Sequence, residues 1–293
     1  MQSVATVAML GNIVDEARRD GARVGFVPTM GFLHEGHVSL MDRARRETDL
    51  VVSSIFVNPL QFAVGEDLST YPRDLEQDTA MAEAAGVDVL FVPPVEVMYP
   101  REVITEVAVA PLARLWEGAT RPTHFTGVST VVSKLFNLVG PCNAYFGEKD
   151  FQQLAIIRRM VSDLSFDVEV VGCPIVREAD GLALSSRNTY LDAHERSAAT
   201  VLRRALDVGL SVMASGERDP DIVGAMMAAV IEAEPLAQLD YAAAVDAASL
   251  EKPMQLAGEV RLLVAAQVGR PRLIDNDGVE LIESGSVPDI GNR

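Results

Sequence analysis

The chain has 293 residues, a length at which one hydrophobic core usually gives way to two domains. Its contents of 48% hydrophobic and 23% charged residues are ordinary for a globular protein, and its formal net charge of −17 disfavours binding to the phosphates of tRNA or DNA. Two cysteines are too few for a disulfide framework. The sequence shows neither a signal-like start nor an apolar run of about 20 residues, so we expect a cytoplasmic protein that does not bind membranes.

Helix-like and strand-like patterns alternate along the first part of the chain. The expected elements are, in order, helix 3–20, strand 24–28, helix 34–46, strand 50–57, helix 72–85, strand 87–92, strand 102–109, helix 126–139, strand 143–146, helix 150–164 and strand 167–176. This alternation predicts a parallel sheet with helices on both faces. Ligands of such sheets bind outside the carboxyl ends of the strands.

The pattern changes after a run of polar turn residues at 177–190. The elements expected beyond it are helices 192–214 and 219–234 and strands 239–246, 259–267 and 271–275. We therefore predict an α/β protein with a Rossmann-like, parallel-sheet nucleotide-binding domain over residues 1–175. A smaller α+β lid domain over 176–293 follows it, with a loose tail from about residue 283.

The strand at 24–28 leads into a motif that carries two histidines. His34 and His37 are three residues apart, so they share one face of the first helical turn. Unpaired backbone N–H groups at a helix N-terminus, together with two imidazoles and a nearby glycine at Gly31, suit the phosphates of a nucleotide. A chance surface pair and a metal site are the alternatives, but no third ligand with suitable spacing lies nearby.

Two further motifs follow predicted strands or open a helix. Gln61 comes after strand 50–57, where its amide can bind a substrate or be an ordinary surface group. Asp74 and Asp78 are four residues apart and share a helix face. A carboxylate there can hold magnesium near a triphosphate, or the two acids can simply favour the helix dipole on a solvated face.

A lysine and an arginine mark the last two motifs. Lys149 follows Gly147 at a strand end and offers a mobile positive charge to phosphate, while Asp150 can cap the next helix. Ser185, Ser186 and Arg187 make a possible phosphate clamp or an ordinary turn before helix 192–214. His124 is expected to be structural or loop-forming, with a direct catalytic role as the alternative.

These motifs together resemble the pantothenate synthetase family (pantoate–β-alanine ligases). The resemblance covers roughly residues 20–275, and its five motifs occur in the family's order. They are Pro28-Thr29-Met30-Gly31 with His34-Glu35-Gly36-His37, Phe56-Val57-Asn58-Pro59-Leu60-Gln61-Phe62, the segment from Tyr71 to Asp78, Phe146-Gly147-Glu148-Lys149-Asp150-Phe151-Gln152-Gln153, and the segment from Arg177 to Asn188. The first motif is of the HIGH type, which class I aminoacyl-tRNA synthetases and small nucleotidyltransferases share.

The resemblance implies an ATP-dependent ligase that joins (R)-pantoate to β-alanine through a pantoyl adenylate and releases AMP and pyrophosphate. It implies ATP as a substrate, Mg²⁺ as a cofactor and a homodimer. The implied catalytic residues are His34, His37, Lys149, Ser185, Ser186 and Arg187. The implied ATP contacts are Met30, Gly31, Phe32, Leu33, His34, Glu35, Gly36, His37, Gly147, Glu148, Lys149, Asp150, Val176, Leu184, Ser185, Ser186 and Arg187. The implied substrate contacts are Pro28, Met30, Gln61, Phe62 and Gln153, and the implied metal ligand is Asp78.

Three other classes share some of these features. A related nucleotidyltransferase would need further basic residues for a second phosphate and would not require β-alanine. A non-catalytic nucleotide sensor would tolerate the loss of Gln61 and Gln153, yet both are present. A tRNA-charging enzyme is disfavoured by the negative charge and by the lack of an anticodon-binding region.

Overall fold

The computed structural model describes residues 1–63, 65–66 and 68–281. The chain divides into two compact units, Met1–Thr189 and a second one that begins at Tyr190. The first unit therefore includes residues 176–189, which the turn pattern assigned to the second domain. The expected tail from residue 283 lies outside the described residues, as do positions 64 and 67 of the loop 62–71.

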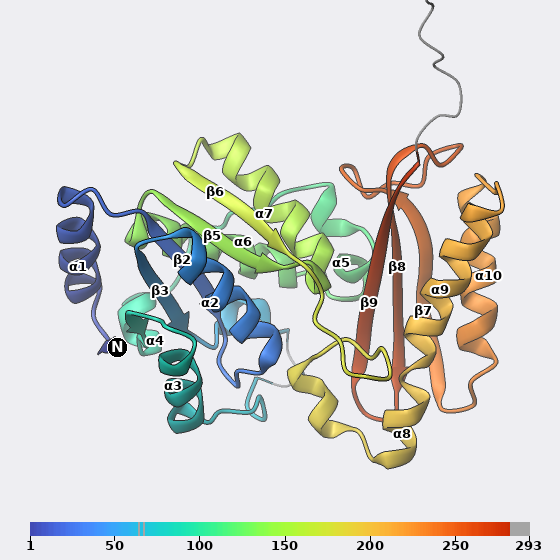
Figure 1. Cartoon of the computed structure of the whole chain (residues 1–293), viewed down its shortest axis with the longest axis horizontal. Helices are drawn as coiled ribbons and strands as arrows, with labels where there is room; N and C mark the ends of the chain where they lie inside the picture. Colours follow the sequence, from blue (N-terminus) through green and yellow to red (C-terminus); the bar gives the residue numbers. More distant parts are fainter. Residues whose placement is uncertain (64, 67, 282–293) are drawn as a thin grey trace, which may run out of the picture. The chain divides into compact units, whose positions relative to one another are not determined.

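A six-stranded parallel sheet forms the centre of the first unit (Figure 1). Its strands are β1 (Gln2–Val4), β2 (Val24–Thr29), β3 (Leu50–Ile55), β4 (Val89–Phe91), β5 (Cys142–Gly147) and β6 (Val168–Cys173). The spatial order is β1-β4-β3-β2-β5-β6, and the pairings between these neighbours are all parallel. The predicted Rossmann-like architecture is thus confirmed.

Helices cover both faces of this sheet. The helices of this unit are α1 (Val7–Arg19), α2 (Glu35–Glu47), α3 (Leu75–Ala84), α4 (Val95–Met98), α5 (Glu117–Thr120), α6 (His124–Val139) and α7 (Phe151–Leu164). Short 3₁₀ turns lie at Pro59–Gln61, Leu112–Arg114, Glu148–Asp150 and Ser186–Tyr190. The chain crosses from β2 to β3 in one direction and from β5 to β6 in the other. Right-handed crossovers therefore put α2 and α7 on opposite faces.

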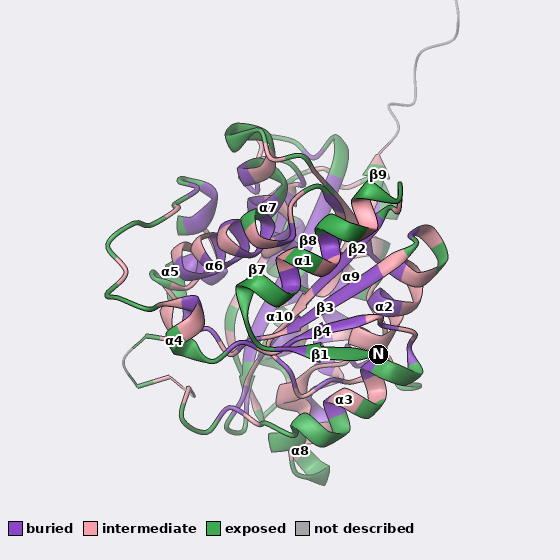
Figure 2. Cartoon of the chain, turned by 90° about the vertical axis from the view of Figure 1, so that its left-hand side faces the viewer, coloured by how far each residue is buried: buried purple, intermediate pink, exposed green. Residues whose placement is uncertain are grey.

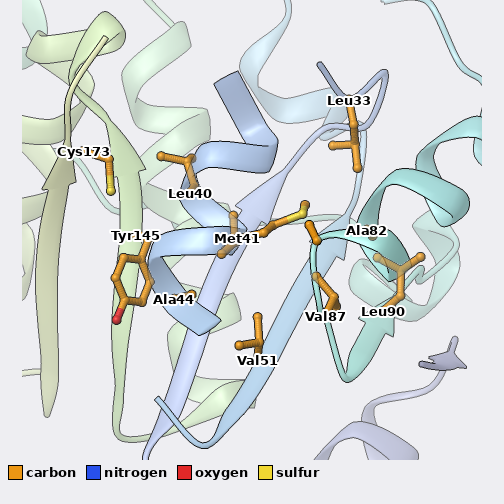
Figure 3. Close-up of a cluster of buried hydrophobic side chains, with 12 residues drawn as sticks. Leu33, Leu40, Met41, Ala44, Val51, Ala82, Val87, Leu90, Tyr145 and Cys173 are labelled. Atoms are coloured by element: carbon orange, nitrogen blue, oxygen red, sulfur yellow. The ribbon is translucent and has the colours of Figure 1, made fainter. Parts of the chain in front are cut away.

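A core of apolar side chains lies between α2 and the sheet. Leu40, Met41 and Ala44 from α2 pack against Val51 of β3 and Tyr145 of β5 (Figure 3). Figure 2 shows β2, β3 and β4 as buried ribbons between layers of helix. Strands that are buried on both faces do not alternate between apolar and polar residues. The buried positions of β2 and β3 are accordingly apolar or small.

Ion pairs tie together the amino-terminal ends of the strands. The Arg23 guanidinium contacts the Asp49 carboxylate at 3.0 Å just before β2 and β3 begin. Arg45 at the end of α2 contacts Asp88 at 2.7 Å, and Asp88 also accepts the N–H of Val51 at 2.8 Å. Charged residues thus occupy the edge of the sheet opposite to the predicted binding edge.

Two predictions for the first unit are wrong in detail. The expected helix 3–20 starts only at Val7, because Gln2–Val4 pairs with β4 as a strand too short to show a pattern. The expected strand 102–109 does not form. Its alternation does not reflect burial, since Ile104 is 89% exposed, and the segment is anchored by a bond from the N–H of Val107 to Oγ1 of Thr130 at 3.0 Å.

The second unit is an α+β structure, as predicted. Its strands β7 (Ala237–Asp246), β8 (Gly258–Val268) and β9 (Arg272–Leu281) form an antiparallel sheet, on which α9 (Val201–Ala214) and α10 (Pro220–Glu232) pack. The expected helix 192–214 is interrupted after α8 (Ala193–Ala198). There the Thr200 hydroxyl donates to the Ser197 carbonyl at 2.8 Å, a local bond that competes with the helical pattern.

Within the described ranges, no helix combines the length and the apolar composition that crossing a bilayer requires.

Candidate active site

The parallel sheet has a topological switch point between β2 and β5. The chain leaves β2 toward β3 on one side and leaves β5 toward β6 on the other, although β2 and β5 are paired neighbours. Open α/β sheets bind ligands at the carboxyl ends of such strands. Because β2 leads to His34 and β5 leads to Lys149, the histidine and lysine motifs flank this point.

A buried carboxylate holds the loop that joins β2 to α2. Gly31 and Phe32 have positive φ angles of 84° and 52°, a region that glycine adopts more easily than phenylalanine. Asp78 on α3 accepts the N–H of Phe32 at 2.8 Å with one oxygen and the N–H of Leu33 at 2.6 Å with the other. A Cβ at Gly31 would lie 2.9 Å from this carboxylate, so glycine leaves the room that the contact needs.

The expected role of Asp78 as a magnesium ligand does not fit this geometry. The residue is 2% exposed, burial raises its pKa, and both oxygens face backbone N–H groups. Across the described part of the chain, no three or more His, Cys, Asp or Glu side chains are grouped to hold a metal ion. The alternative of a solvated helix face fails for the same reason. We therefore assign Asp78 to support of the loop.

The two histidines cap α2 with their own rings. Nδ1 of His34 accepts the N–H of Gly36 at 3.1 Å, and Nδ1 of His37 accepts the N–H of His34 at 3.3 Å. A ring nitrogen that accepts carries no proton, so each neutral ring is protonated on Nε2. The sequence predicted open backbone N–H groups here. The structure instead fills two of them with imidazole and presents two Nε2–H donors from rings whose centroids are 4.1 Å apart.

Burial keeps both rings uncharged at neutral pH. The pKa of His34 is lowered to about 4, first by burial and then by the Lys149 ammonium. The pKa of His37 is lowered to about 3 by burial and by the neighbouring His34 ring, with Lys149 adding to the effect. Asp150 opposes these shifts but does not outweigh them. The shared influence of Lys149 and Asp150 on both rings shows that the histidine and lysine motifs come together.

The lysine motif turns directly from β5 into α7. The Lys149 side chain is 20% exposed, and its Nζ lies 3.8 Å from the carboxylate of Asp150. Asp150 precedes α7 without making the expected side-chain cap, and its side chain is 50% exposed. The capping prediction is therefore wrong, and the carboxylate stays accessible to a ligand.

The two glutamines at the start of α7 have different surroundings. Gln153, the expected substrate residue, is half-buried in the first turn. Gln152 is 6% exposed and donates to the carbonyls of Leu112 and Leu115, each at 2.8 Å. Gln152 thus fixes the segment before α5, whereas Gln153 is the one that retains accessible surface.

Gln61 lies next to the first motif. Its Nε2 donates to the sulfur of Met30 at 2.9 Å, and its Oε1 accepts from Nδ2 of Asn58 at 3.2 Å. A Cβ at Gly127 on α6 would overlap the backbone of Leu60, so α6 approaches this loop closely. The predicted glutamine of the second motif is therefore anchored beside the end of β2.

The backbone of Gln61 is held by residues that the sequence placed in a separate loop. Nδ1 of His124 lies 3.0 Å from the Gln61 carbonyl, and the Arg121 guanidinium donates to the same oxygen at 3.3 Å. Arg121 also pairs with Glu66 at 2.6 Å. His124 is buried, which lowers its pKa, so its ring is a neutral donor to the carbonyl. This bears out the expected loop-forming role of His124.

The fifth motif folds back toward the histidine loop. The N–H of Leu184 donates to the Val176 carbonyl at 3.0 Å, which closes a short hairpin after β6. The Ser186 hydroxyl donates to the carbonyl of Phe32 at 3.4 Å, and Cβ of Leu184 lies 3.9 Å from where a Cβ of Gly36 would be. The serine–arginine loop is thus brought against the first motif.

The remaining predicted contact residues differ in how accessible they are to a ligand. Leu33 is 5% exposed within the core, and its N–H is taken by Asp78, so it supports the loop instead of facing open space. Glu35 is exposed. The others are half-buried along the same edge, namely Pro28, Met30, Phe32, Gly36, Phe62, Gly147, Glu148, Val176, Ser185 and Arg187.

Comparison with known proteins agrees with this geometry. The sequence model of the family described as Pantoate-beta-alanine ligase matches residues 2–277. The chain belongs to the pantoate–β-alanine ligase family. It is accordingly an enzyme, and the resemblance drawn from the five motifs is confirmed.

Relatives within this family match nearly the whole chain. Pantothenate synthetase of Heliobacterium modesticaldum is 55% identical over 266 residues, which cover 91% of this chain and 95% of the relative. The crystal structure of the Thermus thermophilus enzyme superposes with a TM-score of 0.90 at 51% identity, covering 94% of this chain and 99% of that one. A pantoate–β-alanine ligase of Francisella tularensis, described as complexed with beta-gamma ATP and beta-alanine, gives a TM-score of 0.78 at 34% identity, with 94% and 97% covered.

Several groups that shape this ligase site were not identified from the sequence. Asn58 carries a usable signal, since an asparagine before proline commonly caps a turn, and it does cap the turn Pro59–Gln61. Tyr99 donates to Asn58 from far along the chain, and Glu66 pairs with Arg121 in the same long-range way. Local sequence patterns do not predict such long-range contacts.

Proposed function

We propose that this ligase condenses (R)-pantoate with β-alanine at the expense of ATP and releases AMP and pyrophosphate. The observation that carries the proposal is the convergence of the His34 and His37 donors with the Lys149 ammonium at the switch point, next to the amide of Gln61. Membership of the ligase family and the ATP and β-alanine of the Francisella relative support the same substrates.

The reaction proceeds in two steps. A carboxylate does not react with an amine at neutral pH because oxide would have to leave. In the first step a pantoate carboxylate oxygen attacks the α-phosphorus of ATP, and the bond to the pyrophosphate oxygen breaks. In the second step the unprotonated amine of β-alanine attacks the acyl carbon of pantoyl adenylate, AMP leaves with the bonding electrons, and the new amide loses a proton to solvent.

The histidines act as hydrogen-bond donors in this scheme. Negative charge grows on the leaving pyrophosphate, and fixed donors lower the energy of that transition state. The pKa values of His34 and His37, about 4 and about 3, leave both rings neutral before ATP binds, so each ring offers an Nε2–H donor to the phosphates. Lys149 adds a full positive charge beside them.

The other predicted contacts complete the two halves of the site. Ser185, Ser186 and Arg187 bind phosphate oxygens from the fifth motif, and Arg187 suits them because its guanidinium can donate two parallel bonds. Gln61 and Gln153 hold the polar groups of pantoate. The apolar surfaces at the end of β2 and after β3 pack its methyl groups, and they come from Pro28, Met30 and Phe62.

Magnesium enters this scheme with ATP. Asp78 is committed to backbone N–H groups, so a magnesium ion would be held by the phosphates and water as part of the substrate, where it would neutralise phosphate charge. The homodimer, the cytoplasmic location and a lid that shields the adenylate from water, formed by the second unit or the loop 62–71, also belong to this proposal.

A coupled assay of AMP release tests the function. We expect release that requires pantoate and β-alanine together, and pantoate-dependent exchange of labelled pyrophosphate into ATP without β-alanine, which reports the adenylate. A nucleotidyltransferase would release pyrophosphate without AMP, and a nucleotide sensor would release neither. Lys149→Ala should abolish the exchange while the fold stays intact, and exchange near the wild-type rate in that variant would remove Lys149 from the mechanism.

A further inference from the structure

The orientation of the Asn58 side-chain amide is decided by two backbone groups. Its Oδ1 accepts the N–H of Leu60 at 3.3 Å, and its Nδ2 donates to the carbonyl of Gly127 at 3.1 Å. A backbone N–H can only donate and a carbonyl can only accept, so the reversed amide would lose both bonds. Asn58 is 1% exposed, which makes such a loss costly.

This orientation passes to Gln61. Nδ2 of Asn58 also donates to Oε1 of Gln61 at 3.2 Å, so the Gln61 oxygen faces Asn58 and its NH₂ group faces Met30. This NH₂ lies 2.9 Å from the sulfur of Met30, which is a weak acceptor. A carboxylate or hydroxyl oxygen of a ligand is a stronger acceptor and can replace that contact.

Tyr99 completes the chain of bonds. Its hydroxyl donates to Oδ1 of Asn58 at 2.8 Å, the shortest bond that Asn58 makes among those described. The tyrosine ring packs edge-on against Phe56 with centroids 5.8 Å apart, and the Lys134 ammonium lies 5.6 Å from the ring centroid. Burial raises the pKa of Tyr99, so the hydroxyl remains a donor over the working pH range.

We infer that Tyr99 is a positioning residue for pantoate, because its hydroxyl adds the shortest bond to the Asn58 amide, which holds the Gln61 amide with its donor end toward the substrate. The inference rests on the proposed function and makes it more specific. The substrate group at Gln61 must be a hydrogen-bond acceptor, which the carboxylate and the hydroxyls of pantoate are. Tyr99 itself does not touch the reacting atoms.

The kinetic test uses Tyr99→Phe, which removes the hydroxyl and keeps the ring. We expect KM for pantoate to rise three- to tenfold, the effect of about one neutral hydrogen bond, while kcat and KM for ATP stay within twofold. Tyr145→Phe is the matched control, since Tyr145 is a buried tyrosine whose hydroxyl donates to Glu47 at 3.1 Å. It should leave all three constants unchanged.

A double-mutant cycle separates positioning from general packing. In a Gln61→Ala background, Tyr99→Phe should have no further effect on KM for pantoate, because the group that it positions is gone. The same rise in both backgrounds would overturn the inference, and so would an equal rise in KM for ATP or no rise at all.

A spectroscopic readout keeps this test independent of the proposed reaction. The side-chain NH₂ resonances of Gln61, identified by their loss in Gln61→Ala, should shift in Tyr99→Phe and not in Tyr145→Phe. If the wild-type protein releases no AMP, the proposed function fails while this spectrum still tests the bond chain. Unshifted Gln61 resonances in Tyr99→Phe would overturn the inference whatever the activity.

Discussion

The loops 30–37 and 184–189 both reach the candidate ATP site but are held in different ways. The first is fixed from within the fold by the two Asp78 bonds of 2.6 and 2.8 Å and by the capping histidines. One bond that joins the second loop to the first, from Ser186 to Phe32, is longer, at 3.4 Å. A fixed loop meets a charged ligand without reorganising, and a loosely joined loop can adjust to it. We therefore expect the first loop to act as a template and the second to close on ATP.

The largest effect should come from Asp78→Asn, which breaks the template. The amide cannot accept from both Phe32 and Leu33, so a buried N–H loses its partner, and we expect the free energy of unfolding to fall by about 3 kcal/mol. The loop carries both histidine donors, and their displacement should lower kcat on the order of 1,000-fold. Chemical denaturation and the AMP-release assay measure the two effects.

The control for this change is Asp74→Asn on the same helix. Asp74 caps α3 by accepting the N–H of Gln77 at 3.0 Å, and asparagine caps helices about as well as aspartate. Stability and activity should both stay near wild type. Rescue of Asp78→Asn by high magnesium would return Asp78 to the metal role and contradict the template.

The second-largest effect is expected from Arg187→Ala, which affects the adjustable loop. Loss of one phosphate donor should reduce kcat about 100-fold, while the free energy of unfolding should fall by less than in Asp78→Asn, because Arg187 is only half-buried. Arg187→Ala should therefore lower activity without a comparable loss of stability, whereas Asp78→Asn should lower both. A stability loss as large as that of Asp78→Asn would show that the two loops are held alike.

Alanine substitutions at Gly36 and Gly147 should have smaller effects on the steady-state kinetics, and the two effects should differ. A Cβ at Gly36 would lie 2.8 Å from Cε1 of His34, so Gly36→Ala should displace that ring and lower kcat about tenfold. Gly147 has a φ of −73° and nothing within 4 Å of an added Cβ, so Gly147→Ala should fold normally and raise only KM for ATP. Steady-state kinetics of both variants check this, and a larger loss at Gly147 would contradict it.

The last expected effect is a pH dependence of stability. His34 and His37 have folded pKa values of about 4 and about 3, below the unfolded value of about 6.5, so the unfolded chain binds more protons between these limits. Their contribution to stability is complete above about pH 6.5 and is lost as pH falls toward 4. Denaturation at pH 5 and 7.5 should show a shallower decline in a His34→Asn, His37→Asn variant. An equal decline would mean that the rings are charged in the fold.

Much of this site could be predicted because it lies in local patterns. The apolar runs before Pro28 and Asn58 located β2 and β3, and the turn after each strand located a motif. Since all these strands are parallel, their carboxyl ends meet at one edge, and the histidine, glutamine and lysine motifs could be placed together without knowing the strand order.

What could not be predicted depends on partners far apart in the chain. Asp78 has the same local surroundings as an ordinary helix-capping acid, and only packing of α3 against the loop directs its carboxylate to Phe32 and Leu33. The segment 102–109 has the alternation of a strand but gains no burial, as exposed Ile104 shows. In both cases tertiary contacts decide the outcome, and local sequence does not report them.

The pairs Arg23–Asp49 and Arg45–Asp88 lie at the end of the sheet opposite to the candidate ATP site. Substitutions there can retune melting temperature and its salt sensitivity while leaving turnover unaltered. The same division offers protein engineers a region for thermal adjustment that is separate from the chemistry.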